Sequence, residues 1–320
     1  MKHKTFLLVT IILAGYFANA QQSSLTFTPH WLPQAQFAGY YVARDKGFYN
    51  DEGLRVNIKH PSASVNATQM LENKMADVVS LFLVTALKSR ANNLKLVNIA
   101  QQSQHSALMF VTHKKSGIEQ LKQLNGKRIA IWKSGFDEVP KALMQTNNYN
   151  VEWVPILSSI NLFMAGGVDA MTVMWYNEYD QIINAGKNPD ELNTFRFSDY
   201  GYNIPEDGLY CLESTYLQRK NNLRKFVKAT INGWEYARKH PEEALDVVLK
   251  EMKKAHVPTN YTHQKWMLQC ILELNLPGNK NVEKGELSET DFHKTLNLLK
   301  NGSYINTNIT FDKFYKPVLK

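Results

Sequence analysis

The fold of this chain is decided by the stretch from His30 to Tyr49, which reads HWLPQAQFAGYYVARDKGFY. It follows residues 25–28, which have the character of a short strand. Pro33 is tolerated at a helix start, apolar residues then recur at helical spacing, and Gly47 ends the pattern. A strand that delivers the Trp31 indole to a helix start can build a small-molecule site, because free backbone N–H groups and a ring face meet there. The alternative is that Trp31 only covers the end of the strand.

Residues 1–20 have the pattern of a secretory signal peptide. A basic start is followed by an apolar run and by Ala18-Asn19-Ala20, so we expect cleavage before Gln21. The apolar run is too short to favour a membrane span, and no later stretch reaches that length. Cysteine is absent near the cleavage site, so a lipid anchor is not expected. These features predict a protein exported to the periplasm.

The net charge of +8 falls to +6 once the signal peptide with Lys2 and Lys4 is removed. The excess is spread along the chain, for example over residues 220–228, without an arginine-rich arm or a basic block. We therefore interpret it as solvated helix faces and expect no nucleic-acid partner. The two cysteines, Cys211 and Cys270, could form a disulfide in an exported protein. Two buried free thiols are the alternative that we favour.

Alternating strand and helix patterns run through the first two thirds of the chain. The series restarts near residue 114, which predicts two similar α/β lobes. From residue 215 onward the pattern is almost entirely helical, with one face of a long helix marked by apolar residues between Leu223 and Trp234.

Aromatic and polar side chains stand at three predicted strand ends. They are Trp31, Trp132 with Ser134, and the run Trp175-Tyr176-Asn177-Glu178. Ligands of α/β sheets bind beyond the carboxyl ends of the strands, so these groups would converge on one cleft if the lobes face each other. For each tryptophan taken alone, a core position at the end of its sheet is the alternative.

The run Tyr176-Asn177-Glu178 places a ring, an amide and a carboxylate in consecutive positions. The amide both donates and accepts hydrogen bonds, and the carboxylate accepts from N–H groups. This combination suits a planar, nitrogen-rich heterocycle. The alternative is a solvated helix N-terminus at which the dipole favours Glu178.

The acidic pair Glu206-Asp207 lies beside Gly208 in a predicted loop. Without nearby His or Cys, the pair gives little indication of a metal site, and we expect surface charges. Common enzyme motifs are also missing from the sequence: G-x-S-x-G, H-E-x-x-H, a P-loop and G-x-G-x-x-G. This favours binding over catalysis, without a cofactor or metal.

Several segments carry a family resemblance that extends over nearly the whole mature chain. They are Trp31-x-Pro33, AGYYVARDKGFYNDEGL at 38–54, GKRIAIW at 126–132, VDAMTVMWYNEY at 168–179, PEDGLY at 205–210, and the run from Phe226 through Trp234 to Pro241-x-Glu243-Ala244. With these segments the chain resembles substrate-binding proteins of ABC transporters, in the group that binds alkanesulfonates and thiamine-pyrimidine precursors.

The resemblance implies a two-lobed α/β fold of the periplasmic-binding-protein type II class, with a ligand cleft between the lobes. It assigns residues 21–113 and 209–320 to lobe 1 and residues 114–208 to lobe 2. It also implies a monomer that delivers its solute to an ABC permease. The candidate ligand-binding residues are Trp31, Gln36, Ser62, Ser64, Trp132, Ser134, Trp175, Tyr176, Asn177 and Glu178.

Among the ligands of this group, Glu178 favours a neutral or cationic heterocycle, because a carboxylate repels a sulfonate. We therefore expect a pyrimidine-type thiamine precursor or a similar ring. The same fold includes a fungal synthase of the thiamine pyrimidine that uses pyridoxal phosphate and iron. That enzyme has a cysteine-rich cluster and a Lys/His pair on one helix. Here residues 65–73 contain neither Lys nor His, and cysteine occurs only at positions 211 and 270. A third hypothesis is that the protein binds its solute for a periplasmic sensor instead of a transporter.

Overall fold

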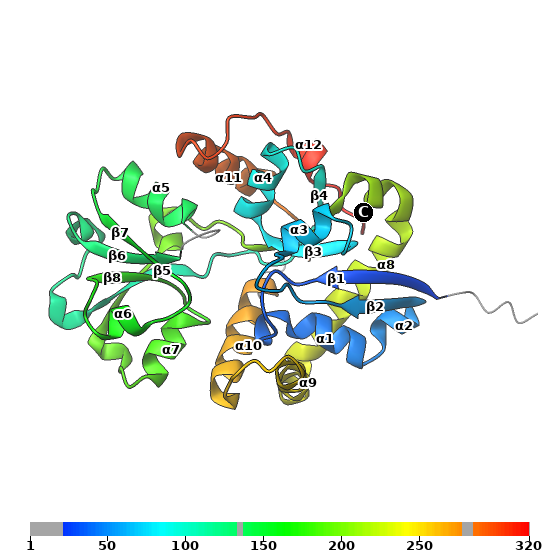
Figure 1. Ribbon diagram of the computed structural model, residues 1–320, viewed down its shortest axis with the longest axis horizontal. Coiled ribbons are helices and arrows are strands. Elements are labelled where there is room, and N and C mark those ends of the chain that lie inside the picture. Colours follow the sequence, from blue (N-terminus) through cyan, green and yellow to red (C-terminus); the bar gives the residue numbers. More distant parts are fainter. Residues whose placement is uncertain (1–21, 133–136, 277–283, 320) are drawn as a thin grey trace, which may run out of the picture.

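The computed structural model describes residues 22–132, 137–276 and 284–319, which form two α/β lobes (Figure 1). Each lobe contains a five-stranded sheet. The first sheet has the order β2-β1-β3-β10-β4 and consists of β1 (Ser23–Thr28), β2 (Leu54–Ile58), β3 (Val78–Phe82), β4 (Leu96–Gln101) and β10 (Asp207–Leu212). The second has the order β7-β6-β8-β5-β9 and consists of β5 (Leu108–His113), β6 (Arg128–Trp132), β7 (Glu152–Ile156), β8 (Ala170–Met174) and β9 (Leu192–Arg196).

The two sheets repeat one pairing pattern. In lobe 1, β1 pairs in parallel with β2 and β3, and β10 runs antiparallel between β3 and β4. In lobe 2, β6 pairs in parallel with β7 and β8, and β5 runs antiparallel between β8 and β9. The antiparallel strand of each sheet is thus the first strand after the chain crosses from the other lobe. The predicted pair of similar α/β lobes is confirmed.

The predicted lobe boundary between residues 113 and 114 disagrees with the strand pairing at β5. That boundary places residues 108–113 in lobe 1, whereas β5 hydrogen bonds to β8 and β9 of the second sheet. Likewise β10 begins at Asp207, two residues before the predicted return to lobe 1. The crossovers are therefore the short segments 102–107 and 201–206.

Helices cover both faces of each sheet, as the wound topology requires. In Figure 1, α11 and α12 lie above the first sheet and α1 and α9 below it, while α5 lies above the second sheet and α7 below it. Lobe 1 carries α1 (Ala38–Asp45), α2 (Phe48–Asp51), α3 (Ala67–Glu72), α4 (Leu83–Ala91), α8 (Glu213–Lys239), α9 (Pro241–Lys254), α10 (Tyr261–Asn275), α11 (Glu289–Asn301) and α12 (Phe311–Phe314). Lobe 2 carries α5 (Glu138–Thr146), α6 (Asn161–Met164) and α7 (Glu178–Asn184).

The helix of the opening stretch, α1, packs closely against α8. A Cβ at Gly39 would lie 2.2 Å from the Trp234 ring, and a Cβ at Gly233 would lie 2.1 Å from the Gly39 carbonyl oxygen. Both glycines are therefore required by the close approach of two backbones rather than by a turn. This contact anchors the segment that leads out of β1 and through Trp31.

The two crossovers are hydrogen bonded to each other. The N–H groups of Gln102 and Ser103 donate to the Asp207 carbonyl at 2.8 and 2.9 Å, and the N–H of Glu206 donates to Ser103 Oγ at 2.9 Å. The Glu206 carboxylate accepts from the N–H of Ala107 at 2.6 Å. The lobes are thus connected at a narrow, hydrogen-bonded junction.

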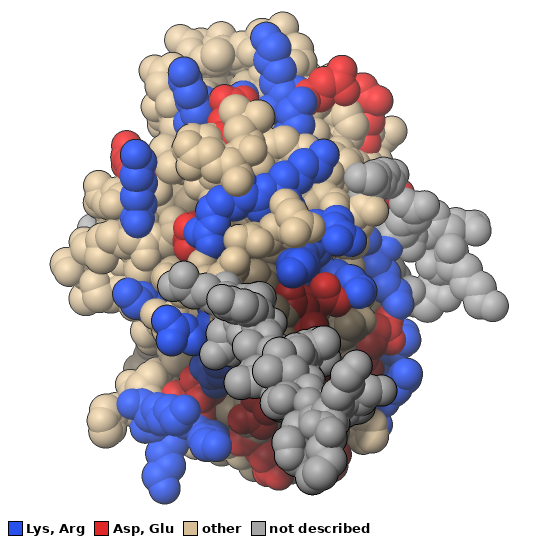
Figure 2. Space-filling model, turned by 90° about the vertical axis from the view of Figure 1, so that its right-hand side faces the viewer, with Lys and Arg blue, Asp and Glu red and all other residues tan. Residues whose placement is uncertain are grey.

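Lys and Arg side chains gather on the outer end of lobe 1, interspersed with acidic side chains (Figure 2). Lys228 of α8, for example, pairs with Glu52 at 2.6 Å. Cys211 and Cys270 are buried free thiols, so the disulfide alternative is excluded. Within the described ranges, helices that are both long and apolar enough to cross a membrane do not occur. The predicted signal peptide lies outside the described residues.

Candidate functional site

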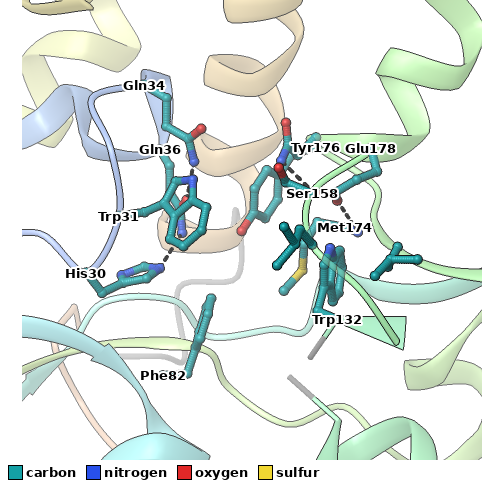
Figure 3. A pocket seen from close by; sticks show the side chains of 13 residues that line it. His30, Trp31, Gln34, Gln36, Phe82, Trp132, Ser158, Met174, Tyr176 and Glu178 are labelled. Atoms are coloured by element: carbon teal, nitrogen blue, oxygen red, sulfur yellow. Dashed lines mark hydrogen bonds between the residues drawn. The ribbon is translucent and has the colours of Figure 1, made fainter. Parts of the chain in front are cut away.

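A cavity of about 190 Å³ lies between the two lobes (Figure 3). Lobe 1 lines it with His30, Trp31, Gln34, Gln36 and Phe82. Lobe 2 lines it with Trp132, Ile156, Leu157, Ser158, Met174, Tyr176, Asn177 and Glu178. Trp31 reaches in from one lobe and Tyr176 from the other, so each lobe supplies an aromatic side chain.

The lobe 1 wall is the turn between β1 and α1, held by a chain of side-chain hydrogen bonds. Gln34 Nε2 donates to Gln36 Oε1 at 2.7 Å, and Gln36 Nε2 donates to Asp207 Oδ2 at 2.9 Å. Gln36 is buried, whereas Trp31 is 45% exposed. The indole is therefore carried on a fixed turn with much of its surface free to contact a ligand.

His30 lies at the foot of the same wall. Its backbone N–H donates to Ser80 Oγ at 3.0 Å, and its Nδ1 lies 3.4 Å from Asp207 Oδ1. Burial lowers the pKa of His30, against the opposing effect of the Asp207 charge. Burial also raises the pKa of Asp207 above its usual range. At neutral pH the cavity therefore meets a neutral imidazole at this point.

The lobe 2 wall is the turn that follows β8. Glu178 begins α7, and its carboxylate accepts from the N–H of Met174 at 3.0 Å and from Asn177 Nδ2 at 2.9 Å. Glu178 is 4% exposed, and burial raises its pKa to about 7 despite these hydrogen bonds. Tyr176 is also buried, which raises the pKa of its hydroxyl. The wall offers a ring face and a carboxyl group that changes protonation near neutral pH.

Six of the predicted site residues line this cavity, and all of them except Gln36 belong to the strand-end pattern. They are Trp31, Gln36, Trp132, Tyr176, Asn177 and Glu178. Ser134 lies outside the described residues.

Ser62, Ser64 and Trp175 do not line the cavity. Ser62 Oγ and Ser64 Oγ lie 3.2 Å apart in an exposed loop, where Ser62 Oγ accepts from the N–H of Val65. Their hydrogen bonds lie within that loop. The Arg196 guanidinium lies over the Trp175 ring, with Cζ 5.0 Å from the ring centroid. Trp175 points away from the cavity because successive side chains at the end of a strand point to opposite sides.

The expectation that Glu206 and Asp207 are surface charges is wrong, since both are buried. Glu206 accepts hydrogen bonds from Ser106 Oγ and the N–H of Ala107 in the crossover. Burial is the main cause that raises its pKa to about 8, and the neighbouring Asp207 charge adds to the effect. These acids belong to the junction between the lobes and to the support of the Trp31 turn.

Sequence reasoning did not single out several lining residues, among them His30, Phe82, Ile156 and Met174. Phe82, Ile156 and Met174 are the last residues of β3, β7 and β8, and His30 follows the end of β1. The strand-end rule that selected Trp31 could have found them. They are apolar or isolated residues outside any motif, so the sequence pattern alone does not mark them.

The described residues that line the cavity carry few charged groups. Among its described lining residues there is one acid, Glu178, and neither Lys nor Arg. Aromatic rings and amide or imidazole groups provide the rest of its recognition surface. The described part of the cavity thus has the chemistry to stack on a planar ring and to accept hydrogen bonds from it.

The arrangement of two wound sheets with a cavity at their junction is that of the periplasmic-binding-protein fold. The periplasmic aliphatic sulphonate binding protein SsuA from Escherichia coli is similar in structure, with a TM-score of 0.69 at 13% identity, over 90% of this chain and 95% of that one. The family described as NMT1/THI5 like matches residues 34–244, and the chain belongs to this family.

Two curated relatives illustrate the range of the family. A formylaminopyrimidine-binding protein of Halalkalibacterium halodurans is 23% identical over 296 residues, which cover 84% of this chain and 86% of the relative. A 4-amino-5-hydroxymethyl-2-methylpyrimidine phosphate synthase of Aspergillus parasiticus is 22% identical over 295 residues, which cover 86% of this chain and 83% of the relative. The chain is thus similar over most of its length to both a binding protein and an enzyme.

Proposed function

We propose that this protein is the exported solute-binding component of an ABC import system and that it captures a pyrimidine-type heterocycle without turning it over. The observation that carries the proposal is the pairing of aromatic side chains with Glu178 across one cavity. Residues 1–20 would direct export to the periplasm, and the protein would act as a monomer that delivers its solute to a permease.

The proposed ligand is planar and presents N–H donors at its edge. Trp31 and Tyr176 would hold the ring between the lobes, and an aromatic stack is worth roughly 0.5–1.5 kcal/mol beyond the area that it buries. Glu178 would accept from an amino group or a protonated ring nitrogen. A hydrogen bond to a charged group contributes about 1.5–3 kcal/mol, which makes Glu178 the strongest single determinant of specificity.

A sulfonate is the alternative ligand suggested by the similarity to SsuA. An anion would need basic or hydroxyl-rich partners, and it would approach the Glu178 carboxyl group at a cost. The described lining residues therefore favour a neutral or cationic ring.

The synthase relative suggests an enzyme as the second candidate function. The formylaminopyrimidine-binding relative is similar over a comparable share of the chain and supports binding without turnover. Detection of a released product would favour the synthase.

The test is a thermal-shift screen of the mature protein with a formylaminopyrimidine, riboflavin and an aliphatic sulphonate, followed by calorimetry. We expect stabilisation by the pyrimidine and its recovery unchanged after incubation. Trp31→Ala and Glu178→Gln should each weaken binding, whereas Ser62→Ala, on an exposed loop that does not line the cavity, should not. Stabilisation by the sulphonate alone would overturn the heterocycle, and unchanged binding in both cavity variants would overturn the site.

A further inference from the structure

Helix α10 lies at the junction of the two lobes, below the segments that connect them in the view of Figure 1. It contacts α7 of lobe 2 and the 3-10 helix η1 (Ala35–Phe37) of the lobe 1 wall. Its beginning is fixed by Asn260, whose side chain accepts from the N–H of His263 at 2.8 Å. The position of His263 and of the next residue is thereby set by the helix cap.

Gln264 holds the lobe 1 half of the site. Its Oε1 accepts from the N–H of Ala35 at 2.8 Å, within the turn that carries Trp31 and Gln36. Gln264 is 2% exposed, so this is a buried hydrogen bond between segments 229 residues apart.

His263 holds the lobe 2 half. Its Nδ1 lies 2.6 Å from Asp180 Oδ2, and its Nε2 lies 3.2 Å from Asn177 Oδ1. The His263 and Asp180 side chains are only 11% and 10% exposed, so solvent screens this contact little. Asn177 lines the cavity and donates to Glu178. His263 is thus connected through one residue, Asn177, to the carboxylate that the ligand would meet.

Trp266, one turn further along α10, holds the other side of the same loop. Its Nε1 donates to the carbonyl oxygen of Trp175 at 3.0 Å. Tyr176 is therefore flanked by two residues, Trp175 and Asn177, that are both hydrogen bonded to α10. Side chains of this one helix reach both walls of the cavity.

We propose that α10 sets the position of the two lobes relative to each other and that His263 is a positioning residue that links lobe closure to ligand affinity. If the lobes turn about the narrow crossovers, the contacts of His263 must break, whereas those of Gln264 remain within lobe 1. The control of lobe position does not depend on the identity of the ligand. The effect on affinity rests on the proposed function.

The first experiment measures the distance between the lobes in the full mature chain. Spin labels are placed at Glu72→Cys in lobe 1 and Lys122→Cys in lobe 2, both exposed, while the native cysteines are buried. In double electron–electron resonance, His263→Phe and Asp180→Ala should each broaden the distance distribution and increase its mean. Unchanged distributions in the folded variants would overturn the proposal.

A matched control comes from the same helix. Lys265→Gln breaks an exposed ion pair with Glu242 and should leave the distribution as in the parent protein. If His263→Phe does not fold, as judged by circular dichroism, Asp180→Ala decides the outcome, because it removes the same contact from lobe 2.

The second experiment measures the affinity for a formylaminopyrimidine. His263→Phe should raise Kd about tenfold, the factor expected from the low end of the range for hydrogen bonds to charged groups, and Lys265→Gln should leave Kd unchanged. If the parent protein does not bind this probe but the distances change, the proposed ligand fails and the positioning role stands. If the parent protein binds and His263→Phe changes the distances but not Kd, the link to affinity is overturned.

Discussion

Replacement of Glu178 by glutamine should stabilise the protein at pH 8 and leave its stability nearly unchanged at pH 5. Burial raises the pKa of Glu178 from 4.5 to about 7, so the folded protein holds this proton more tightly than the unfolded chain does. The stabilisation is fully present below about pH 4.5 and is lost as the pH rises through about 7. The difference between the two pKa values is worth about 3 kcal/mol in the free energy of unfolding.

Glutamine at position 178 avoids the cost of burying a charge, but its side chain cannot accept hydrogen bonds from both donors that Glu178 uses. The carboxylate accepts from the N–H of Met174 and from the Asn177 amide, and the glutamine oxygen can replace only one of these bonds. The lost hydrogen bond costs about 1 kcal/mol. Glu178→Gln should therefore be about as stable as the parent protein at pH 5, where the lost hydrogen bond nearly cancels the part of the proton-linked stabilisation that is already gone, and more stable by about 2 kcal/mol at pH 8.

Urea unfolding at pH 5 and pH 8, followed by circular dichroism without ligand, measures this difference. Glu206, whose pKa is also raised, titrates in both proteins and so cancels in the comparison. Glu152→Gln is the matched control, because Glu152 lies on β7 of the same lobe with 66% of its side chain exposed, and its effect should not vary with pH. A Glu178→Gln difference that stays constant between pH 5 and pH 8 would refute the claim that this carboxyl group is desolvated.

Three further substitutions test other parts of the structure. Trp31→Ala should raise the Kd for a formylaminopyrimidine about tenfold, because the stack and its buried area are lost, and an unchanged calorimetric Kd would exclude Trp31 from the site. Gly233→Ala should destabilise the protein by about 1–3 kcal/mol, because its Cβ would meet the Gly39 carbonyl at 2.1 Å, and an unchanged Tm would contradict this packing. Lys88→Met leaves the buried Glu138 carboxylate without its ion-pair partner across the lobes. Lys88→Met should lower the free energy of unfolding by less than the roughly 3–5 kcal/mol that breaking a fully buried pair costs, since the Lys88 side chain is 32% exposed. Adding Glu138→Gln should restore the stability, as measured by urea unfolding.

The sequence predicted both lobes and six of the residues that line the cavity, chiefly because strand ends can be recognised locally. Trp132 is the last residue of β6, and the Tyr176 turn follows β8 directly. A rule based on the ends of strands therefore brought residues from two lobes to one cavity. It failed for Trp175, whose ring leaves the strand on the other side.

The sequence-based predictions failed where contacts between distant segments determine the structure. The segment LMFVTH of β5 has the pattern of a buried strand in either sheet, so only its pairing with β8 and β9 assigns it to lobe 2. Glu206 and Asp207 are buried because the crossover and the Trp31 turn supply donors from more than 90 residues away. The contacts of His263 with Asp180 bridge 83 residues and have no local pattern at all.

The charge of the ligand can be determined from the proton that Glu178 gains or loses when the ligand binds. With a pKa of about 7, this carboxyl group is partly protonated at neutral pH. A cation, or a ring that donates an N–H to the carboxylate, lowers that pKa and releases protons, whereas an anion in the same cavity raises it and takes protons up. His30 does not obscure the signal if it stays neutral, because burial holds its pKa below the usual value. Calorimetry at pH 7 in buffers of different ionisation enthalpy should therefore show proton release with a formylaminopyrimidine and none with Glu178→Gln. Proton uptake with a ligand that does not itself titrate near pH 7 would mean that the cavity receives the ligand as an anion, and the selectivity argued from Glu178 would be wrong.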